Sequence, residues 1–219
     1  MDIIELKDAL LEATLPNVLF DGWTDHALRG AAQAVGVGAE EARRACPGGI
    51  ADLALWFSDW ADRRMTARYA AADTARLGTG RRVALAVRLR LEALEGHREA
   101  MRSWLLWMAM PNHALAAAKL VSQTVDEIWQ TIGDGATDVS YYSKRAMLAA
   151  VYSATLLHWL GDESEDHAAT WDFLDRSLKA LAGAGRSVAQ AGGVGKLLTL
   201  VPSPVRFARQ MRRRVHGRA

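Results

Sequence analysis

The side chains that most often do chemistry are scattered along this sequence and form no catalytic pattern. The six histidines stand far apart, and none has another histidine four residues away, the spacing that puts two zinc ligands on one helix face. A helical di-iron site needs two Glu-x-x-His segments, and the sequence contains none. His158, between Leu157 and Trp159, is therefore expected to be a hydrogen-bonded core residue. No metal site is predicted.

Phosphate-binding and redox motifs are equally incomplete. The glycine-rich residues 192–197 lack both the leading glycine and the Ser/Thr of a P-loop. Cys46 is the single cysteine, which excludes an internal disulfide and fits a reducing compartment. We therefore expect a protein that is not an enzyme and that needs no cofactor.

The elements that would position binding residues are helices. No stretch alternates with period 2, and Ala, Leu, Arg, Glu and Met dominate the sequence. Pro16 is expected to distort the end of the first helix, and the glycines at 183, 185, 192 and 193 to form a flexible joint. The pattern predicts an all-α fold, with helices over residues 2–20, 24–34, a short helix ending near 46, 50–77, 81–94, 97–110, 112–132, 140–160 and 165–182.

Neither long uncharged run is long enough to cross a bilayer. Residues 103–118 and 146–161 are uncharged over 16 residues each, whereas a spanning helix needs roughly 20. The acidic N-terminus shows no signal or transit pattern. We expect a soluble or peripheral protein, either cytoplasmic and on the inner membrane of a bacterium, or on the matrix side of a mitochondrial membrane.

The end of the chain is strongly basic. Residues 186–219 carry eight Lys or Arg and no acidic residue, although the whole chain is only +2. Ser203 and Pro204 favour a helix start. An apolar face opposite arginines is typical of a helix that lies in the headgroup layer of an anionic membrane; a disordered tail or a nucleic-acid contact are the alternatives. The apolar face would comprise Phe207, Met211 and Val215, and the basic face Arg206, Arg209, Arg212 and Arg213.

Two internal segments are more apolar than a surface helix requires. Met and Trp among small Ala neighbours suit an adaptable pocket for a long apolar ligand, although an ordinary helical core would read the same way. The candidate lipid-binding residues are Trp104, Leu105, Trp107, Met108 and Met110 in the first segment, and Met147, Leu148, Val151 and Tyr152 in the second.

Short N-terminal helices followed by longer ones resemble the plan of TetR-type repressors. We predict a helix-turn-helix-like head over residues 1–48, a body over 49–183 and a joint with an amphipathic tail over 184–219. Glu40 and Glu41 fall where a helix would enter the DNA groove, and DNA affinity depends chiefly on phosphate neutralisation. No nucleic-acid partner is therefore expected, and a ligand-sensing TetR-type repressor is the alternative function.

One run of the sequence resembles a known family. Residues 124–129, 133–134, 138 and 141–152, together with Asp21-Gly22-Trp23-Thr24 and Met108-Ala109-Met110-Pro111, are similar to the ubiquinone-biosynthesis lipid-binding accessory proteins, which have a TetR-like fold. The resemblance implies a homodimer that binds an isoprenoid lipid or phospholipid, docks on an anionic membrane surface and assists the demethoxy-ubiquinone hydroxylase. It also implies a partner-binding patch formed by Asp126, Trp129, Asp138, Tyr141, Tyr142 and Arg145.

Overall fold

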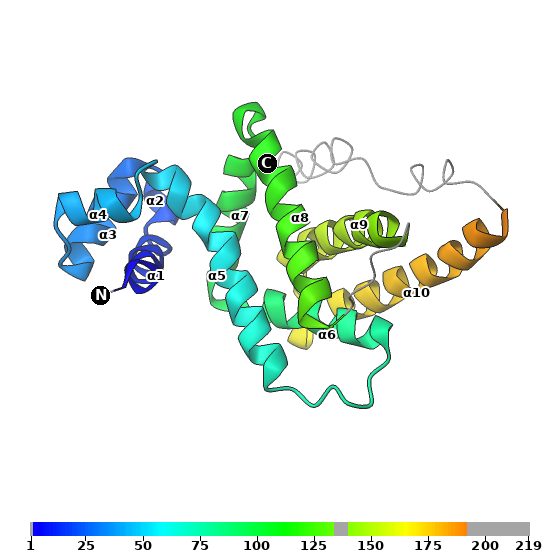
Figure 1. The fold of residues 1–219 in the computed structure, drawn as a ribbon. Coiled ribbons are helices and arrows are strands. Elements are labelled where there is room, and N and C mark those ends of the chain that lie inside the picture. Colours follow the sequence, from blue (N-terminus) through cyan, green and yellow to red (C-terminus); the bar gives the residue numbers. More distant parts are fainter. Residues whose placement is uncertain (1, 134–139, 192–219) are drawn as a thin grey trace. The chain divides into compact units, whose positions relative to one another are not determined.

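The computed structural model describes residues 2–133 and 140–191, and for residues 140–142 and 184–191 the backbone alone. Every regular element in these residues is helical, which confirms the predicted all-α class (Figure 1). Short 3-10 turns at Glu95–His97, Pro111–His113 and Glu165–His167 precede three of the helices. The α-helices are α1 Ile3–Thr14, α2 Val18–Asp21, α3 Asp25–Val35, α4 Ala39–Ala45, α5 Ile50–Ala70, α6 Thr79–Ala93, α7 Arg98–Met108, α8 Ala114–Thr131, α9 Ser140–Leu160 and α10 Ala168–Ala191.

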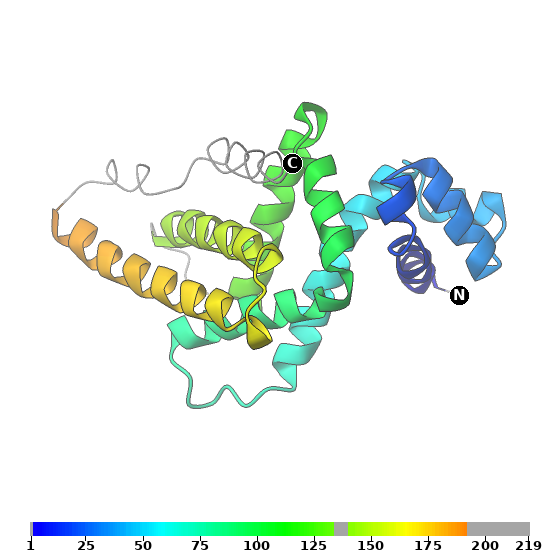
Figure 2. The same cartoon turned by 180° about the vertical axis from the view of Figure 1, so that it is seen from behind.

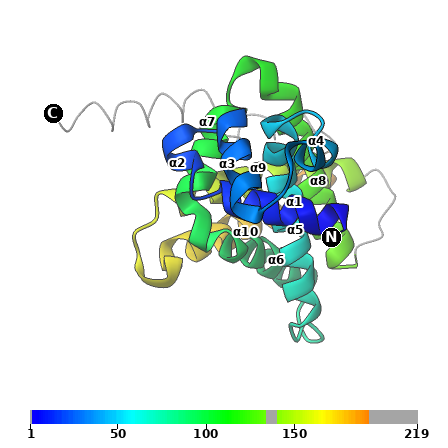
Figure 3. The same cartoon turned by 90° about the vertical axis from the view of Figure 1, so that its left-hand side faces the viewer.

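The first helices form a head that packs on the start of α5. Asp2 and Glu5 make a reciprocal capping box at the start of α1. Thr24 caps α3 by accepting a hydrogen bond from the Ala27 amide at 3.4 Å. Helix α1 contacts α3, α4 and α5, and Figure 3 shows α1, α3 and α4 grouped in front of α5. Leu10 and Ala31 are fully buried in this contact.

Helices α5 to α9 form the body. Helix α5 packs along α6 and α8, while α8 also packs against α9 and α7 (Figure 2). Phe57, Met65, Leu91, Ile128 and Trp159 are among the largest side chains buried there. Residues 2–133 and 140–175 belong to one compact unit, and residues 176–191 belong to a second one.

Several helix ends differ from the sequence prediction. The predicted helix over residues 2–20 is two helices, because α1 ends at Thr14 before Pro16. Helix α5 ends at Ala70 rather than at residue 77, and Asp73 turns the chain by accepting the Ala75 amide at 3.2 Å. Helix α10 continues past the glycines at 183 and 185, where a joint was predicted.

No helix in residues 2–133 or 140–191 combines the length and the apolar character needed to span a bilayer. The predicted domain boundaries at residues 48 and 183 stay predictions.

Candidate functional site

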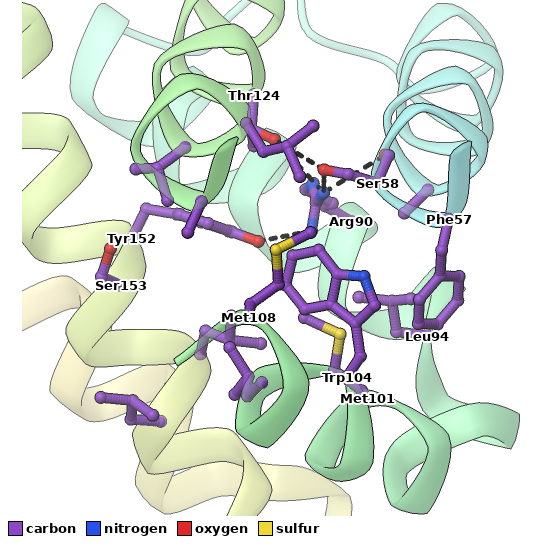
Figure 4. Close-up of a pocket in the computed structure, with 17 residues that line it drawn as sticks. Phe57, Ser58, Arg90, Leu94, Met101, Trp104, Met108, Thr124, Tyr152 and Ser153 are labelled. Atoms are coloured by element: carbon purple, nitrogen blue, oxygen red, sulfur yellow. Dashed lines mark hydrogen bonds between the residues drawn. The ribbon is translucent and has the colours of Figure 1, made fainter. Parts of the chain in front are cut away.

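A cavity of about 130 Å³ lies among helices α5 to α9. An engineered cavity of about 150 Å³ in another protein binds benzene, so this one has room for one ring or one isoprene unit. A complete polyprenyl chain does not fit into it. The lining is mainly apolar and comprises Phe57, Ser58, Ala61, Arg90, Leu94, Met101, Trp104, Leu105, Met108, Ala117, Leu120, Val121, Thr124, Tyr152, Ser153, Leu156 and Leu157 (Figure 4).

Helix α7 supplies one wall of the cavity. Met101, Trp104 and Met108 recur at helical spacing and are all buried. The Trp104 Nε1–H donates to the Ala54 carbonyl oxygen at 2.7 Å, and the indole meets the Phe57 ring edge-on with centroids 6.3 Å apart. These contacts fix the indole, while the two methionines can adapt their shape to an apolar group.

A buried guanidinium marks the polar side of the cavity. Arg90 is 2% exposed and extends from α6 toward α5, α8 and α9. It donates from Nε to Asp62 Oδ1 at 2.6 Å and from Nη2 to Ser58 Oγ at 3.0 Å and to Thr124 Oγ1 at 3.2 Å. Its Nη1 donates to the Tyr152 hydroxyl oxygen. The cluster thus links four helices with one side chain.

The electrostatics of this cluster balance burial against pairing. Burial raises the pKa of the Asp62 carboxyl, although Arg90 and a hydrogen bond from the Thr124 hydroxyl at 3.1 Å favour its charged form. Burial would lower the pKa of Arg90, but Asp62 and Tyr152 outweigh it and raise that pKa. Burial also raises the pKa of the Tyr152 phenol. Tyr152 therefore keeps its proton at neutral pH.

The Tyr152 hydroxyl can act as a hydrogen-bond donor toward the cavity. Its oxygen accepts from Arg90, and within the described part of the chain we find no hydrogen bond that it donates. Because Tyr152 also lines the cavity, its O–H can donate to an oxygen of a bound molecule.

Four of the nine predicted lipid-binding residues line this cavity: Trp104, Leu105, Met108 and Tyr152. The other five do not. The Trp107 ring instead stacks on His113 with centroids 3.6 Å apart, and Met110 is 40% exposed. On α9, Leu148 and Val151 are buried away from the cavity, and Met147 is half-buried.

The sequence interpretation missed the lining that comes from α5, α6 and α8. The strongest overlooked signal is Arg90, which shares its helix face with Val83, Ala86 and Val87, all of them buried. An arginine at an apolar position of an amphipathic helix indicates a buried, paired charge.

His158 makes the hydrogen bond that the sequence predicts, but it is half-buried rather than a core residue. Its Nδ1 lies 3.1 Å from Thr170 Oγ1, and its ring stacks on Phe173 with centroids 4.9 Å apart. Across the described residues, no group of three or more His, Cys, Asp or Glu is arranged to hold a metal ion.

The structure brings together part of the predicted partner-binding patch. Arg145 on α9 pairs with Asp126 on α8. Trp129 is 8% exposed, and the Lys144 ammonium lies 5.7 Å from its ring centroid, so this indole belongs to the packing between helices. Tyr141 and Tyr142 are in the first turn of α9, with only their backbone described. Asp138 and all seven predicted membrane-binding residues (Arg206, Phe207, Arg209, Met211, Arg212, Arg213 and Val215) lie outside the described residues.

Comparisons with solved structures identify the fold. The TetR transcriptional regulator from Nitrosomonas europaea superposes with a TM-score of 0.66 and 22% identity, covering 81% of this chain and 98% of that one. At this identity the likeness shows a TetR-like fold alone.

Comparisons of sequence identify the family. Residues 114–185 match the COQ9 family model. The ubiquinone biosynthesis protein COQ9-A, mitochondrial, of Xenopus laevis is 31% identical over 199 residues, which cover 88% of this chain and 62% of that protein. Human COQ9 is 29% identical over 203 residues, which cover 89% of this chain and 63% of that protein. The chain thus spans somewhat less than two thirds of these relatives, and it belongs to the COQ9 family of ubiquinone biosynthesis proteins.

Proposed function

We propose that this protein is a non-catalytic accessory protein of ubiquinone biosynthesis. It holds part of an isoprenoid quinone precursor at the membrane surface and presents it to the hydroxylase that acts on demethoxy-ubiquinone. The observation that carries the proposal is the apolar cavity of about 130 Å³ in a chain of the COQ9 family.

The size of the cavity limits how the ligand is held. One buried isoprene unit of five carbons contributes about 4 kcal/mol at ~0.8 kcal/mol per buried carbon group. That is enough for reversible capture, while the rest of a long chain stays in the bilayer or enters only if the helices move. Reversible capture suits a protein that passes its ligand on.

The Tyr152 hydroxyl gives the mainly apolar cavity a hydrogen-bond donor that can orient a ligand. Its oxygen accepts from Arg90, and its proton can bond a carbonyl or phenol oxygen of the ligand. An amphiphile with one oxygen beside an apolar body therefore fits better than a plain hydrocarbon of the same volume.

Filling the cavity tests the proposal. Ala117 lines the cavity on α8, whereas the next residue, Ala118, is exposed. We expect Ala117→Trp to reduce the isoprenoid that co-purifies with the protein at least about tenfold, which corresponds to about 1.4 kcal/mol, as measured by mass spectrometry of extracted lipid. Ala118→Trp is the matched control and should retain the ligand. Equal lipid in both variants would show that this cavity is not the binding site.

The partners follow from the same proposal. We expect a homodimer formed through α9 and α10, the hydroxylase as the pathway partner, and a peripheral location on the membrane. Analytical ultracentrifugation tests the dimer: a monomer at micromolar concentration would contradict it.

The charge of the head bears on the alternative function, a TetR-type repressor that binds DNA. Glu40 and Glu41 are in the first turn of α4, where Glu40 is exposed and Glu41 is half-buried, and Arg43 pairs with Glu40 at 2.8 Å. A groove-entering helix with this charge is poorly suited to phosphate. Salt-dependent binding to a palindromic duplex would favour a repressor instead.

A further inference from the structure

Large exposed hydrophobic side chains occur on α2 and around the turn from α7 to α8. Leu115 is 89% exposed, Phe20 88% and Leu106 72%, and Leu19 and Met110 are also exposed. Two of the five are on α2, which packs against α7, and three are at the turn that joins α7 to α8 (Figure 1). They are five of the seven exposed large hydrophobics in the described residues. We name these five residues the tip surface.

The stretch of chain around the turn from α7 to α8 carries few charges. Residues 100–125 contain no acidic residue, and their only formal charges are Arg102 and Lys119, one on each side of the turn. Between these two residues the chain is uncharged, and Leu115 is its most exposed large hydrophobic residue. The one acid on α2, Asp21, lies 3.4 Å from the His26 ring. Arg102 pairs with Glu99 at 2.8 Å, whereas Lys119 is exposed on α8. An apolar tip with an exposed lysine beside it complements hydrocarbon beneath a layer of lipid phosphates.

An aromatic residue of the kind found at membrane interfaces lies at the end of α7, directly before the turn to α8. Trp107 is half-buried and stacks on His113, whose Nδ1 lies 2.9 Å from the Trp107 carbonyl oxygen. An amphipathic ring held between an apolar tip and the body is typical of the lipid–water boundary.

The same hairpin forms the wall of the cavity. Leu105 and Met108 line the cavity, whereas Leu106 and Met110 beside them are exposed. On α8, Ala117 lines the cavity two residues after exposed Leu115. The part of the tip surface on α7 and α8 and the wall of the cavity are thus two faces of one short hairpin. An apolar molecule that leaves a bilayer at the tip therefore has a short way to the cavity.

We propose that the tip surface is a membrane contact, which inserts into the boundary between headgroups and acyl chains. It adds to the predicted basic tail a second contact, built from the folded helices α2, α7 and α8. The proposal rests on the membrane location proposed above, but not on the identity of the lipid in the cavity.

A site-specific probe tests the insertion. Cys46 is the only cysteine and is buried, so an environment-sensitive fluorophore on Leu115→Cys in the full chain labels one site. With vesicles of four parts phosphatidylcholine to one part phosphatidylglycerol, we expect a blue shift and quenching by acyl-chain-brominated lipid. The matched control is Ile3→Cys on α1, exposed at 48% outside the tip surface, and it should show neither change. An aqueous spectrum at Leu115 on vesicle-bound protein, or no vesicle binding at all, overturns the proposal.

Introducing negative charge tests how much the tip surface contributes to membrane binding. Leu106→Glu with Leu115→Glu places two carboxylates on exposed sites and should weaken vesicle binding at least about tenfold. Ile3→Glu with Ile4→Glu, also exposed, should bind as the parent chain does. Unchanged binding in the tip variant, or a probe at Leu115 that shifts only when the hydroxylase is added, would assign the surface to something other than lipid.

The readout of bound isoprenoid keeps the two proposals apart. If the Leu115 probe inserts but the protein carries no isoprenoid, the proposed function is wrong and the membrane contact is supported. If the protein carries isoprenoid but the probe stays in water, the membrane contact is wrong and the proposed function is supported.

Discussion

At the scale of single residues, Arg90 is the side chain whose loss should destabilise the body most. Its guanidinium reaches Asp62, Ser58, Thr124 and Tyr152 from three other helices. A buried pair that loses one member costs about 3–5 kcal/mol, because the other charge is left uncompensated. We therefore expect Arg90→Met to destabilise the fold by about that amount in urea unfolding, with Asp62 stranded.

A second variant separates charge from packing. Replacing both partners, as in Arg90→Met with Asp62→Leu, removes the stranded carboxylate and should recover most of the loss. If the double variant is as unstable as the single one, shape rather than charge governs this site.

The residues of the site were only partly predictable from the sequence. Trp104 and Met108 were predicted because an apolar, aromatic segment on one helix is visible in the sequence alone. The role of Arg90 depends on Asp62, 28 residues earlier, and Tyr152, 62 residues later, and no local pattern reports such distant pairing. Trp107 carries the same apolar signal as Trp104, yet it lies outside the cavity on His113.

At the scale of elements, the pair that joins α8 to α9 makes a prediction about the partner. Arg145 pairs with Asp126, and its side chain is 18% exposed. We expect Arg145→Glu to weaken capture of the hydroxylase in a pull-down, with unchanged helical content by circular dichroism. If the loss comes from a broken pair, then Arg145→Glu with Asp126→Arg restores capture. If the arginine touches the partner itself, capture stays lost. Full capture by the single variant would remove Arg145 from the interface.

The start of α10 depends on one carboxylate. Asp162 is 5% exposed and accepts the Thr170 amide at 2.8 Å and the Ser164 amide at 2.9 Å, as well as both hydroxyls. We expect Asp162→Ala to cost about 1–3 kcal/mol and to speed hydrogen exchange at the Thr170 amide. Glu163 is adjacent and exposed, so Glu163→Ala is the control and should leave that exchange unchanged.

The ends of the helices were predicted with unequal accuracy. The range of α9 was predicted to the residue, because its apolar run is long and uninterrupted. The end of α5 was placed seven residues too late, because a turn made by the Asp73 side chain competes with a segment of good helix formers.

For the whole molecule, the same Asp162 governs part of the acid stability. Its hydrogen bonds with Ser164 and Thr170 overcome the opposing effect of burial and hold its pKa well below the ordinary value of 3.8. A depressed carboxyl pKa contributes stability above the unfolded-state pKa, and that contribution is lost as the pH falls toward the folded-state pKa. The loss should therefore begin near pH 5 and deepen below pH 4.

Unfolding free energies between pH 7 and pH 3 check this linkage. We expect Asp162→Asn to be less stable than the parent chain at pH 7 and to lose less stability on acidification, so that the two curves approach each other at low pH. Asp59→Asn, which changes an exposed carboxylate on α5, is the control and should run nearly parallel to the parent. Parallel curves for Asp162→Asn would show that the acid sensitivity of the fold originates elsewhere, and that the carboxylate at the start of α10 acts through its shape alone.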